Sequence, residues 1–286
     1  MPGHDDEHII EAIGRCRVVI RNGKVVSVEP PVIRRCPLAE RFERPVTEIT
    51  EEAVRSNIEH RIARFGMCTP DREVYAEKEF VGFGASELIG GGMKAGLIDA
   101  AVIACDGAGT VIAATPGLVQ GIGGRMSGLV KTSPIPEVMD RIQAAGGYVL
   151  DRSTAEMDPV AGIRMAKQLK YKRIAVTVAS VEDAVSCRRE APDALIIVVH
   201  TTGMTGGDAE LLAKTADLIT CCASGSLRRI AGSKALAQAG TAIPVFAMTP
   251  QGKRLIFEKL MLTNEPVLIK GMKLPFAGDR EPEPLV

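Results

Sequence analysis

The stretch Ile174-Ala175-Val176-Thr177-Val178 begins the pattern that decides the fold of this chain. Similar short runs of apolar and β-branched residues follow at 195–199 and 218–222, and a segment of helical length separates each run from the next. A spacing of about 20 to 27 residues is typical of βα units, in which the crossover forces consecutive strands to pair in parallel. The C-terminal half is therefore predicted to be α/β.

The same rhythm extends toward both ends of the chain and predicts about eight strands. We expect an open, doubly wound, mostly parallel sheet with alternating helices, in preference to a closed barrel. The reason is that the glycine-rich segment 107–146, with a second hairpin strand expected at 110–114, interrupts the regular repeat of a barrel. The predicted strands are 80–83, 100–105, 148–150, 174–178, 195–199, 218–222, 245–248 and 267–270.

The N-terminal quarter follows a different pattern. Strands predicted at 17–20 and 24–28 flank the pair Asn22-Gly23, which tolerates the positive φ angles of a type I′ hairpin turn. A helix is predicted at 50–65, because Thr50 can cap its start and Gly66 can end it. A β-hairpin followed by a helix should therefore precede the α/β region.

The length and charge of the chain limit the classes of protein to consider. Its 286 residues suit an α/β domain at 79–275, preceded by an N-terminal region at 1–78 packed on it and followed by a tail at 276–286. Because 35 basic residues balance 35 acidic ones, a nucleic-acid partner is disfavoured. No run approaches the roughly 18 to 20 apolar residues of a membrane helix, and the first residues lack the apolar core of a signal peptide. We expect a cytoplasmic protein without a membrane partner.

Four of the seven cysteines lie beside Pro, Gly, Asp or Ser at the ends of predicted elements, where separate segments can converge: Cys36, Cys68, Cys105 and Cys222. Thiolates are soft, anionic ligands, and four of them complete an iron-sulfur (4Fe-4S) cluster or a zinc site. No Cys-x-x-Cys pair supports this hypothesis, so an equal alternative is that each is a small buried hydrophobic residue. A nucleophilic role for Cys68 or Cys105 is a further possibility.

Other candidate residues also follow predicted strands. His200 should emerge at the carboxyl end of its strand as an acid-base group, and Asp106 should face the same cleft. Both are candidate catalytic residues, although a hydrogen-bonded histidine and an ordinary loop carboxylate would have the same pattern. The backbone amides and side chains that could hold an anion are those of Gly107, Gly109, Arg125, Thr201, Thr202 and Gly203, whose glycines are equally compatible with tight turns.

Several longer strings carry a family resemblance: HIIEAIG at 8–14, FGMCTPDRE at 65–73, CDGAGT at 105–110, VQGIGGR at 119–125 and VHTTG at 199–203. Together they resemble the family called methanogenesis marker protein 8, over about residues 8–260. The resemblance implies an anaerobic archaeal cytoplasm, a link to methyl-coenzyme M reductase or its coenzymes, and surroundings rich in iron-sulfur proteins. It implies no reaction and no ligand role for any residue.

Three functions are compatible with these observations. The first is an iron-sulfur protein that assists the assembly or reductive activation of a methanogenic enzyme, with that enzyme or its activation complex as partner. The second is an enzyme of methanogenic coenzyme metabolism that acts on a small anionic substrate through a cysteine or histidine. The third is a regulatory or scaffolding subunit without chemistry.

Overall fold

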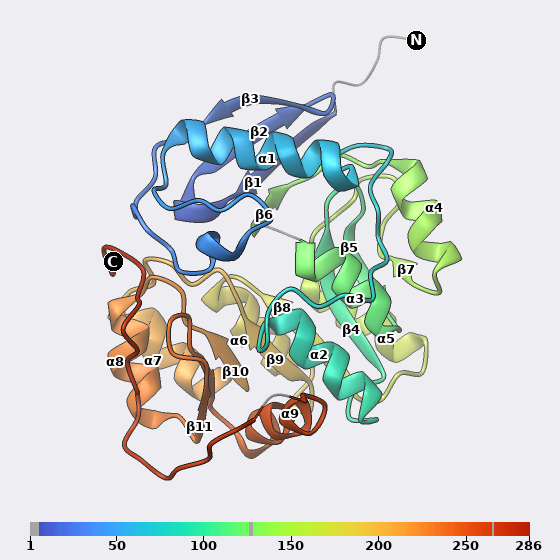
Figure 1. The fold of residues 1–286 in the computed structure, drawn as a ribbon. Helices are drawn as coiled ribbons and strands as arrows, with labels where there is room; N and C mark the ends of the chain where they lie inside the picture. Colours follow the sequence, from blue (N-terminus) through green and yellow to red (C-terminus); the bar gives the residue numbers. More distant parts are fainter. Residues whose placement is uncertain (1–5, 126–127, 265) are drawn as a thin grey trace, which may run out of the picture.

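The computed structural model describes residues 6–125, 128–264 and 266–286. In this part of the chain two sheets form, one of eight strands and one of four (Figure 1). The strands of the large sheet, in spatial order, are β11 (Ala237–Ala239), β12 (Val245–Ala247), β10 (Leu218–Thr220), β9 (Leu195–Val198), β8 (Ile174–Val178), β4 (Ala100–Cys105), β5 (Gly109–Ala113) and β7 (Tyr148–Val149).

The large sheet is open and mixed. Strands β10, β9, β8 and β4 pair in parallel at its centre, as the βα spacing predicted. The flanking pairs β4–β5, β5–β7, β10–β12 and β11–β12 are antiparallel. The prediction of an open α/β sheet is confirmed, but a mostly parallel one is not. The difference at β4–β5 arises because the short Asp106–Ala108 connection can join strands only as an antiparallel hairpin.

Helices cover both faces of the large sheet, and each set buries its apolar side against it. One core cluster draws on α2 (Ala85–Lys94), α3 (Pro116–Ile122), α4 (Pro136–Ala144) and α9 (Pro250–Met261). The other draws on α5 (Pro159–Gln168), α6 (Val181–Glu190), α7 (Gly206–Thr215) and α8 (Gly225–Lys234). No helix in the described ranges is both long and apolar enough to cross a bilayer.

The small sheet lies at one end of the large one and is wholly antiparallel, in the order β3 (Lys24–Val28), β2 (Arg17–Arg21), β1 (Glu7–Glu11) and β6 (Gly128–Lys131). Helix α1 (Glu51–Phe65) packs on it, and Figure 1 shows both above the α/β layer. The β2–β3 turn is confirmed, because Asn22 and Gly23 both have positive φ angles. Short 3-10 turns are η1 (Ile13–Arg15), η2 (Ala39–Arg41) and η3 (Gly123–Arg125).

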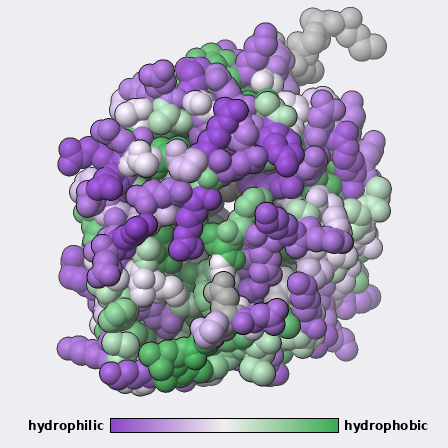
Figure 2. All heavy atoms as spheres, in the orientation of Figure 1, coloured by the Kyte–Doolittle hydropathy of each residue, from purple (hydrophilic) through white to green (hydrophobic). Residues whose placement is uncertain are grey.

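Two predicted strands do not form. Residues 80–83 lie in bends, where the buried carboxylate of Glu87 accepts hydrogen bonds from the Phe80 and Val81 amides at 3.2 and 3.5 Å. Residues 267–270 are unpaired, and Leu268 is 90% exposed. Apolar residues gather along the lower edge in Figure 2, where α9 and the following segment lie. These apolar runs found no neighbouring strand with which to pair.

Three strands were absent from the prediction: β1, β6 and β11. Strand β6 lies in the middle of the chain, yet it completes the N-terminal sheet by pairing with β1. The small sheet, α1 and the segment between them form the N-terminal layer. The C-terminal tail also contacts this layer, since Glu283 forms an antiparallel bridge with Arg35. The division at residues 78 and 275 stays a prediction.

Candidate functional site

The carboxyl ends of the parallel strands lie beneath the N-terminal layer, and this junction contains most of the predicted site residues. Asp106 directly follows β4, His200 comes shortly after β9, and Cys222 comes shortly after β10. Ligands of open α/β sheets bind at this end of the strands. In this chain the carboxyl ends of the strands are covered by the N-terminal layer. The covering parts are the end of α1 and the turn after it.

A buried ion pair joins the two layers. Arg72 and Asp106 are both 0% exposed, and Nε of Arg72 lies 3.0 Å from Oδ1 of Asp106. The backbone N–H of Cys68 donates to Oδ2 of Asp106 at 2.6 Å, and Nη1 of Arg72 donates to the carbonyl of Gly121 at 3.1 Å. Burial alone would raise the pKa of Asp106, but Arg72 and the Cys68 amide outweigh it, so the pKa of Asp106 is lowered. Asp106 is therefore ionised, and it holds Arg72 and the Cys68 backbone in place.

Three guanidinium groups surround the ring of Phe65, the last residue of α1. Their Cζ atoms lie 5.7 Å (Arg61), 5.1 Å (Arg72) and 5.1 Å (Arg125) from the ring centroid. This is the range of cation–π contacts. Arg125 also pairs with Glu73 at 2.7 Å, and Arg61 donates to the backbone carbonyl of Arg125. The cluster brings helix α1, the turn after it and η3 together.

Burial and the charge of Arg61 shift the pKa values of neighbouring groups. Burial is the main cause that lowers the pKa of Arg61 to about 10, and the neighbouring Arg72 lowers it further. Burial, followed by the charge of Arg61, lowers the pKa of His200 to about 4. His200 is therefore a neutral imidazole at physiological pH. Desolvation and like charge both disfavour its protonated form.

His200 occupies an unusual backbone conformation, with φ of 55°. A Cβ built on Gly128 of β6 would lie 3.5 Å from Cγ of His200, so the imidazole packs against the edge of the N-terminal sheet. Non-glycine residues with left-handed φ angles are uncommon and often mark functional sites. This geometry places the histidine at the junction of the two layers.

The threonines after β9 are less suited to hold a ligand. The hydroxyl of Thr201 donates to the carbonyl of Thr220 at 2.7 Å and accepts the N–H of Cys222 at 2.9 Å, so it ties β9 to β10. Thr202 is half-buried in the following turn. Gly203 has a φ of 75°, and its N–H donates to the carbonyl of Ala223 at 3.2 Å.

Gly107 and Gly109 serve the hairpin turn between β4 and β5. Their φ angles are 79° and 68°, and a Cβ on Gly109 would lie 2.1 Å from the carbonyl oxygen of Ala155. The N–H of Gly107 donates to Oγ1 of Thr132 at 2.7 Å, and this oxygen is also hydrogen-bonded to Nδ1 of the buried His8 at 2.7 Å. The backbone at Gly109 therefore lies so close to Ala155 that only glycine, which has no Cβ, fits there.

The four candidate thiols differ in position and burial. Cys68 and Cys105 are both fully buried beside Asp106, which accepts the Cys68 N–H at 2.6 Å and directly follows Cys105 in the chain. Cys36 and Cys222 are half-buried. Burial raises the pKa of all four thiols. Among the residues that the structure describes, no group of three or more His, Cys, Asp or Glu side chains is placed to hold a metal ion.

The sequence predicted that Asp106 and His200 follow strand ends and that Arg125 could hold an anion, but it did not single out Arg61. A basic residue near the end of a helix is ordinary, because cations suit the helix dipole there. The guanidinium of Arg61 nevertheless donates to the Arg125 carbonyl and lies 5.7 Å from the centroid of the Phe65 ring. The spacing of arginines in the sequence gave no sign of this.

The fold and the junction define an α/β protein with a covered, arginine-rich site at the carboxyl edge of its sheet. The chain belongs to the family described as "Uncharacterized protein conserved in archaea" (DUF2099), which it matches over residues 8–261. It is 44% identical over 284 residues to "Uncharacterized protein MJ0054" of Methanocaldococcus jannaschii, a match that covers 98% of this chain and 100% of that relative. The site residues described above all lie within the family match.

Proposed function

We propose that the chain binds a small anionic molecule at the arginine cluster and acts on it as an enzyme of archaeal coenzyme metabolism. The observation that carries the proposal is the convergence of Arg61, Arg72 and Arg125 around Phe65. Guanidinium groups bind carboxylates and phosphates through paired N–H donors. An oxyanion beside Arg61 would relieve the repulsion between the arginines.

His200 supplies the chemical group in this proposal. As a neutral imidazole, it can accept a proton from a bound ligand. An anion beside Arg61 would also offset the positive charge that lowers the pKa of His200, so that binding would increase its basicity. Asp106 would hold Arg72 in place and would not itself exchange protons.

The biological setting of the proposal rests on similarity. The motif strings resemble methanogenesis marker protein 8, and a relative is encoded by Methanocaldococcus jannaschii. Both support a role in archaeal methane metabolism, with a methanogenic coenzyme or its precursor as the anion.

The proposal is tested by the binding of sulfate and of small carboxylates and phosphates, measured by NMR titration of the full chain. Replacing Arg61 with Gln should weaken binding at least about tenfold, and Arg125→Gln should act in the same direction. Arg152→Gln is the matched control, because Arg152 forms an exposed pair with Asp140 at 2.6 Å. Equal affinities of the wild type and the Arg61→Gln variant would refute the proposal.

A second candidate function is an iron-sulfur protein that assists the assembly or activation of a methanogenic enzyme such as methyl-coenzyme M reductase. The observation in its favour is that the buried Cys68 and Cys105 both lie beside Asp106. Among the described residues no three possible ligands converge, so a cluster would require the cysteines to approach or a second chain to contribute. Anaerobic purification should then yield about four irons per chain with matching sulfide. Folded protein without iron would count against it.

A further inference from the structure

An open groove lies on the surface beside the arginine cluster. Its volume is about 430 Å³, and its walls come from the segment after α1 and from the end of α4: Glu73, Val74, Tyr75, Arg141, Ala144 and Ala145. Sites for small organic molecules typically measure about 300 to 1,000 Å³ and are mostly apolar, with a few polar groups that fix the orientation of the ligand. The size of the groove and its lining fit this description.

The tyrosine of the groove is held in place by α3. A Cβ built on Gly117 of α3 would lie 2.2 Å from Cζ of Tyr75, so the ring rests directly on the helix backbone. The N–H of Ala76 also donates to the carbonyl of Gly117 at 3.0 Å. Tyr75 nevertheless stays 50% exposed. A ligand that packs on a side chain held in this way pays little of the usual entropy cost of ordering it.

Arg141 fixes the distance between the two walls of the groove. Its Nη1 atom donates to the carbonyl of Pro70 and, at 3.5 Å, to the carbonyl of Arg72. These contacts tie α4 to the turn after α1. The groove is therefore part of the folded structure and does not depend on a ligand to form.

Glu73 joins the groove to the arginine cluster. Its carboxylate lies 2.7 Å from Nη1 of Arg125, and the same guanidinium lies 5.1 Å from the centroid of the Phe65 ring. The side chain of Glu73 is 52% exposed, whereas that of Arg125 is 18% exposed. The carboxylate can therefore turn into solvent while the guanidinium stays in place. Glu73 shows which kind of group Arg125 binds next to the groove.

The energetics of this exchange favour a ligand with an apolar part. When the acid group of a ligand replaces the Glu73 carboxylate at Arg125, one partly exposed ion pair is exchanged for another, and such pairs contribute little. The apolar surface that the ligand buries against Tyr75 and the alanines of α4 is a gain without such a loss. A purely polar anion obtains no benefit from the groove.

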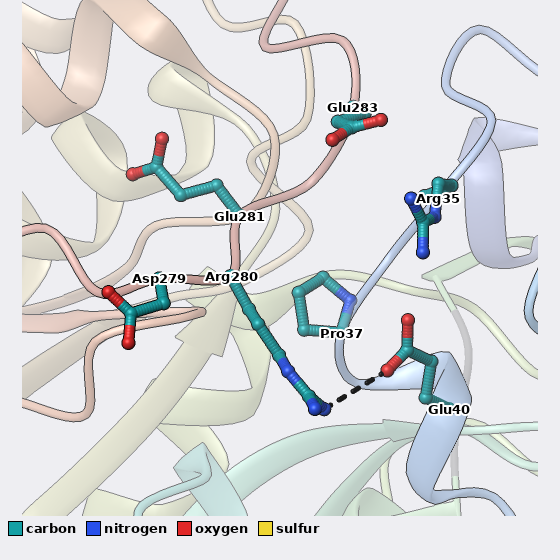
Figure 3. Close-up of a pocket in the computed structure, with 7 residues that line it drawn as sticks. All are labelled: Arg35, Pro37, Glu40, Asp279, Arg280, Glu281 and Glu283. Carbon is teal, nitrogen blue, oxygen red and sulfur yellow. Dashed lines mark hydrogen bonds and ion pairs between the residues drawn. The ribbon is translucent and has the colours of Figure 1, made fainter.

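A second surface pocket, of about 220 Å³, has a different lining. It lies between residues 35–40 and the C-terminal tail, and apart from Pro37 its lining residues are charged (Figure 3). Arg280 of the tail pairs there with Glu40 at 3.4 Å. This pocket offers no apolar floor, so its ion pair is a suitable reference for that of Glu73.

We propose that the ligand of the arginine cluster is an amphiphilic acid. Its carboxylate or phosphate group takes the place of Glu73 at Arg125, and a short apolar chain attached to that group lies in the groove on Tyr75. This inference rests on the function proposed above and specifies the chemical class of its substrate.

The first test is NMR titration of the full chain with straight-chain carboxylic acids from acetate to octanoate. Affinity should rise about threefold with each methylene group that the groove covers. Tyr75→Ala should flatten this dependence, whereas Phe257→Ala, which truncates a part-exposed ring on α9, should keep it. Thermal unfolding shows whether each variant is folded. If Tyr75→Ala is not, Ala144→Gln fills the groove from an exposed position and should flatten the dependence in the same way.

The second test concerns Glu73. Glu73→Gln removes the group that competes for Arg125, so every acid in the series should bind about twofold to fivefold more tightly. Glu40→Gln is the matched control, because it removes a carboxylate from the pair with Arg280 in the other pocket. It should leave the affinities unchanged.

The outcomes separate this inference from the function on which it rests. If acetate and sulfate bind but affinity does not increase with chain length, or if Glu73→Gln binds the acids no more tightly than the wild type, the amphiphilic ligand is refuted and the anion site stands. If neither sulfate nor any acid binds, both proposals fail.

Discussion

Replacing Asp106 with Asn is the most informative single change in the junction. The substitution preserves shape but removes the negative charge, so it leaves the guanidinium of Arg72 fully buried without its anion. Asp106 also accepts the Cys68 amide at 2.6 Å. An Asn oxygen can keep only one of these two contacts in full. The change therefore removes the buried negative charge together with one of its two contacts.

The expected loss of stability follows from the burial of both partners. Removing one member of a buried, hydrogen-bonded ion pair costs about 3 to 5 kcal/mol, because the remaining charge stays desolvated. In contrast, Asp140→Asn breaks the exposed pair with Arg152, and exposed pairs contribute about 1 kcal/mol or less. The two substitutions are chemically identical, so the difference between them measures the effect of burial.

The assay is urea unfolding of the wild type and both variants at pH 7, followed by circular dichroism. The double variant Arg72→Met/Asp106→Leu should recover much of the loss, because it removes both charges and fills similar volume. If Asp106→Asn lowers the free energy of unfolding by less than about 1 kcal/mol, or no more than Asp140→Asn, the pair is not desolvated and the reasoning fails.

Four further outcomes are expected. Arg61→Met should raise the pKa of His200 above its value of about 4, as read from the imidazole resonances by NMR, because it removes the like charge; an unchanged pKa would show that burial alone lowers it. Since the pKa of His200 is lower in the folded chain, stability should fall as pH drops from about 6.5 toward 4, and a His200→Gln variant should lose part of this slope. Thr50→Ala should cost about 1 kcal/mol in urea unfolding, because the Thr50 hydroxyl accepts the Ala53 N–H at 3.1 Å at the start of α1; no loss would mean that the cap does not stabilise the helix. Gly66→Ala should destabilise the chain by more than about 1 kcal/mol, because φ is 72° there and a Cβ would lie 2.4 Å from the backbone of Asp71, and a neutral result would contradict this backbone path.

Much of the architecture was predictable because local signals were strong. The runs at 100–105 and 174–178 became β4 and β8 with the same bounds, and α1 begins after the predicted cap, Thr50. Apolar β-branched runs and capping residues act over a few positions, so they can be read from the sequence alone. Segment 267–270 is also a mainly apolar run but lies exposed and unpaired. Its composition could not indicate whether a partner strand was available.

The candidate site was predictable only in part. That Asp106 and His200 lie at one edge follows from parallel pairing, since the carboxyl ends of neighbouring parallel strands must meet there. That Arg61 joins them depends on the packing of α1 over this edge, and helical periodicity does not encode that packing.

The sequence by itself determined the central strands of the large sheet, the helix α1 and which strand ends carry polar residues, because these properties depend on neighbours a few positions away. Only the tertiary structure decided that β6 crosses to the N-terminal sheet, that segment 267–270 stays unpaired, and that three arginines surround Phe65. Such contacts join residues far apart in the chain, and their formation depends on the burial and shape of the whole fold.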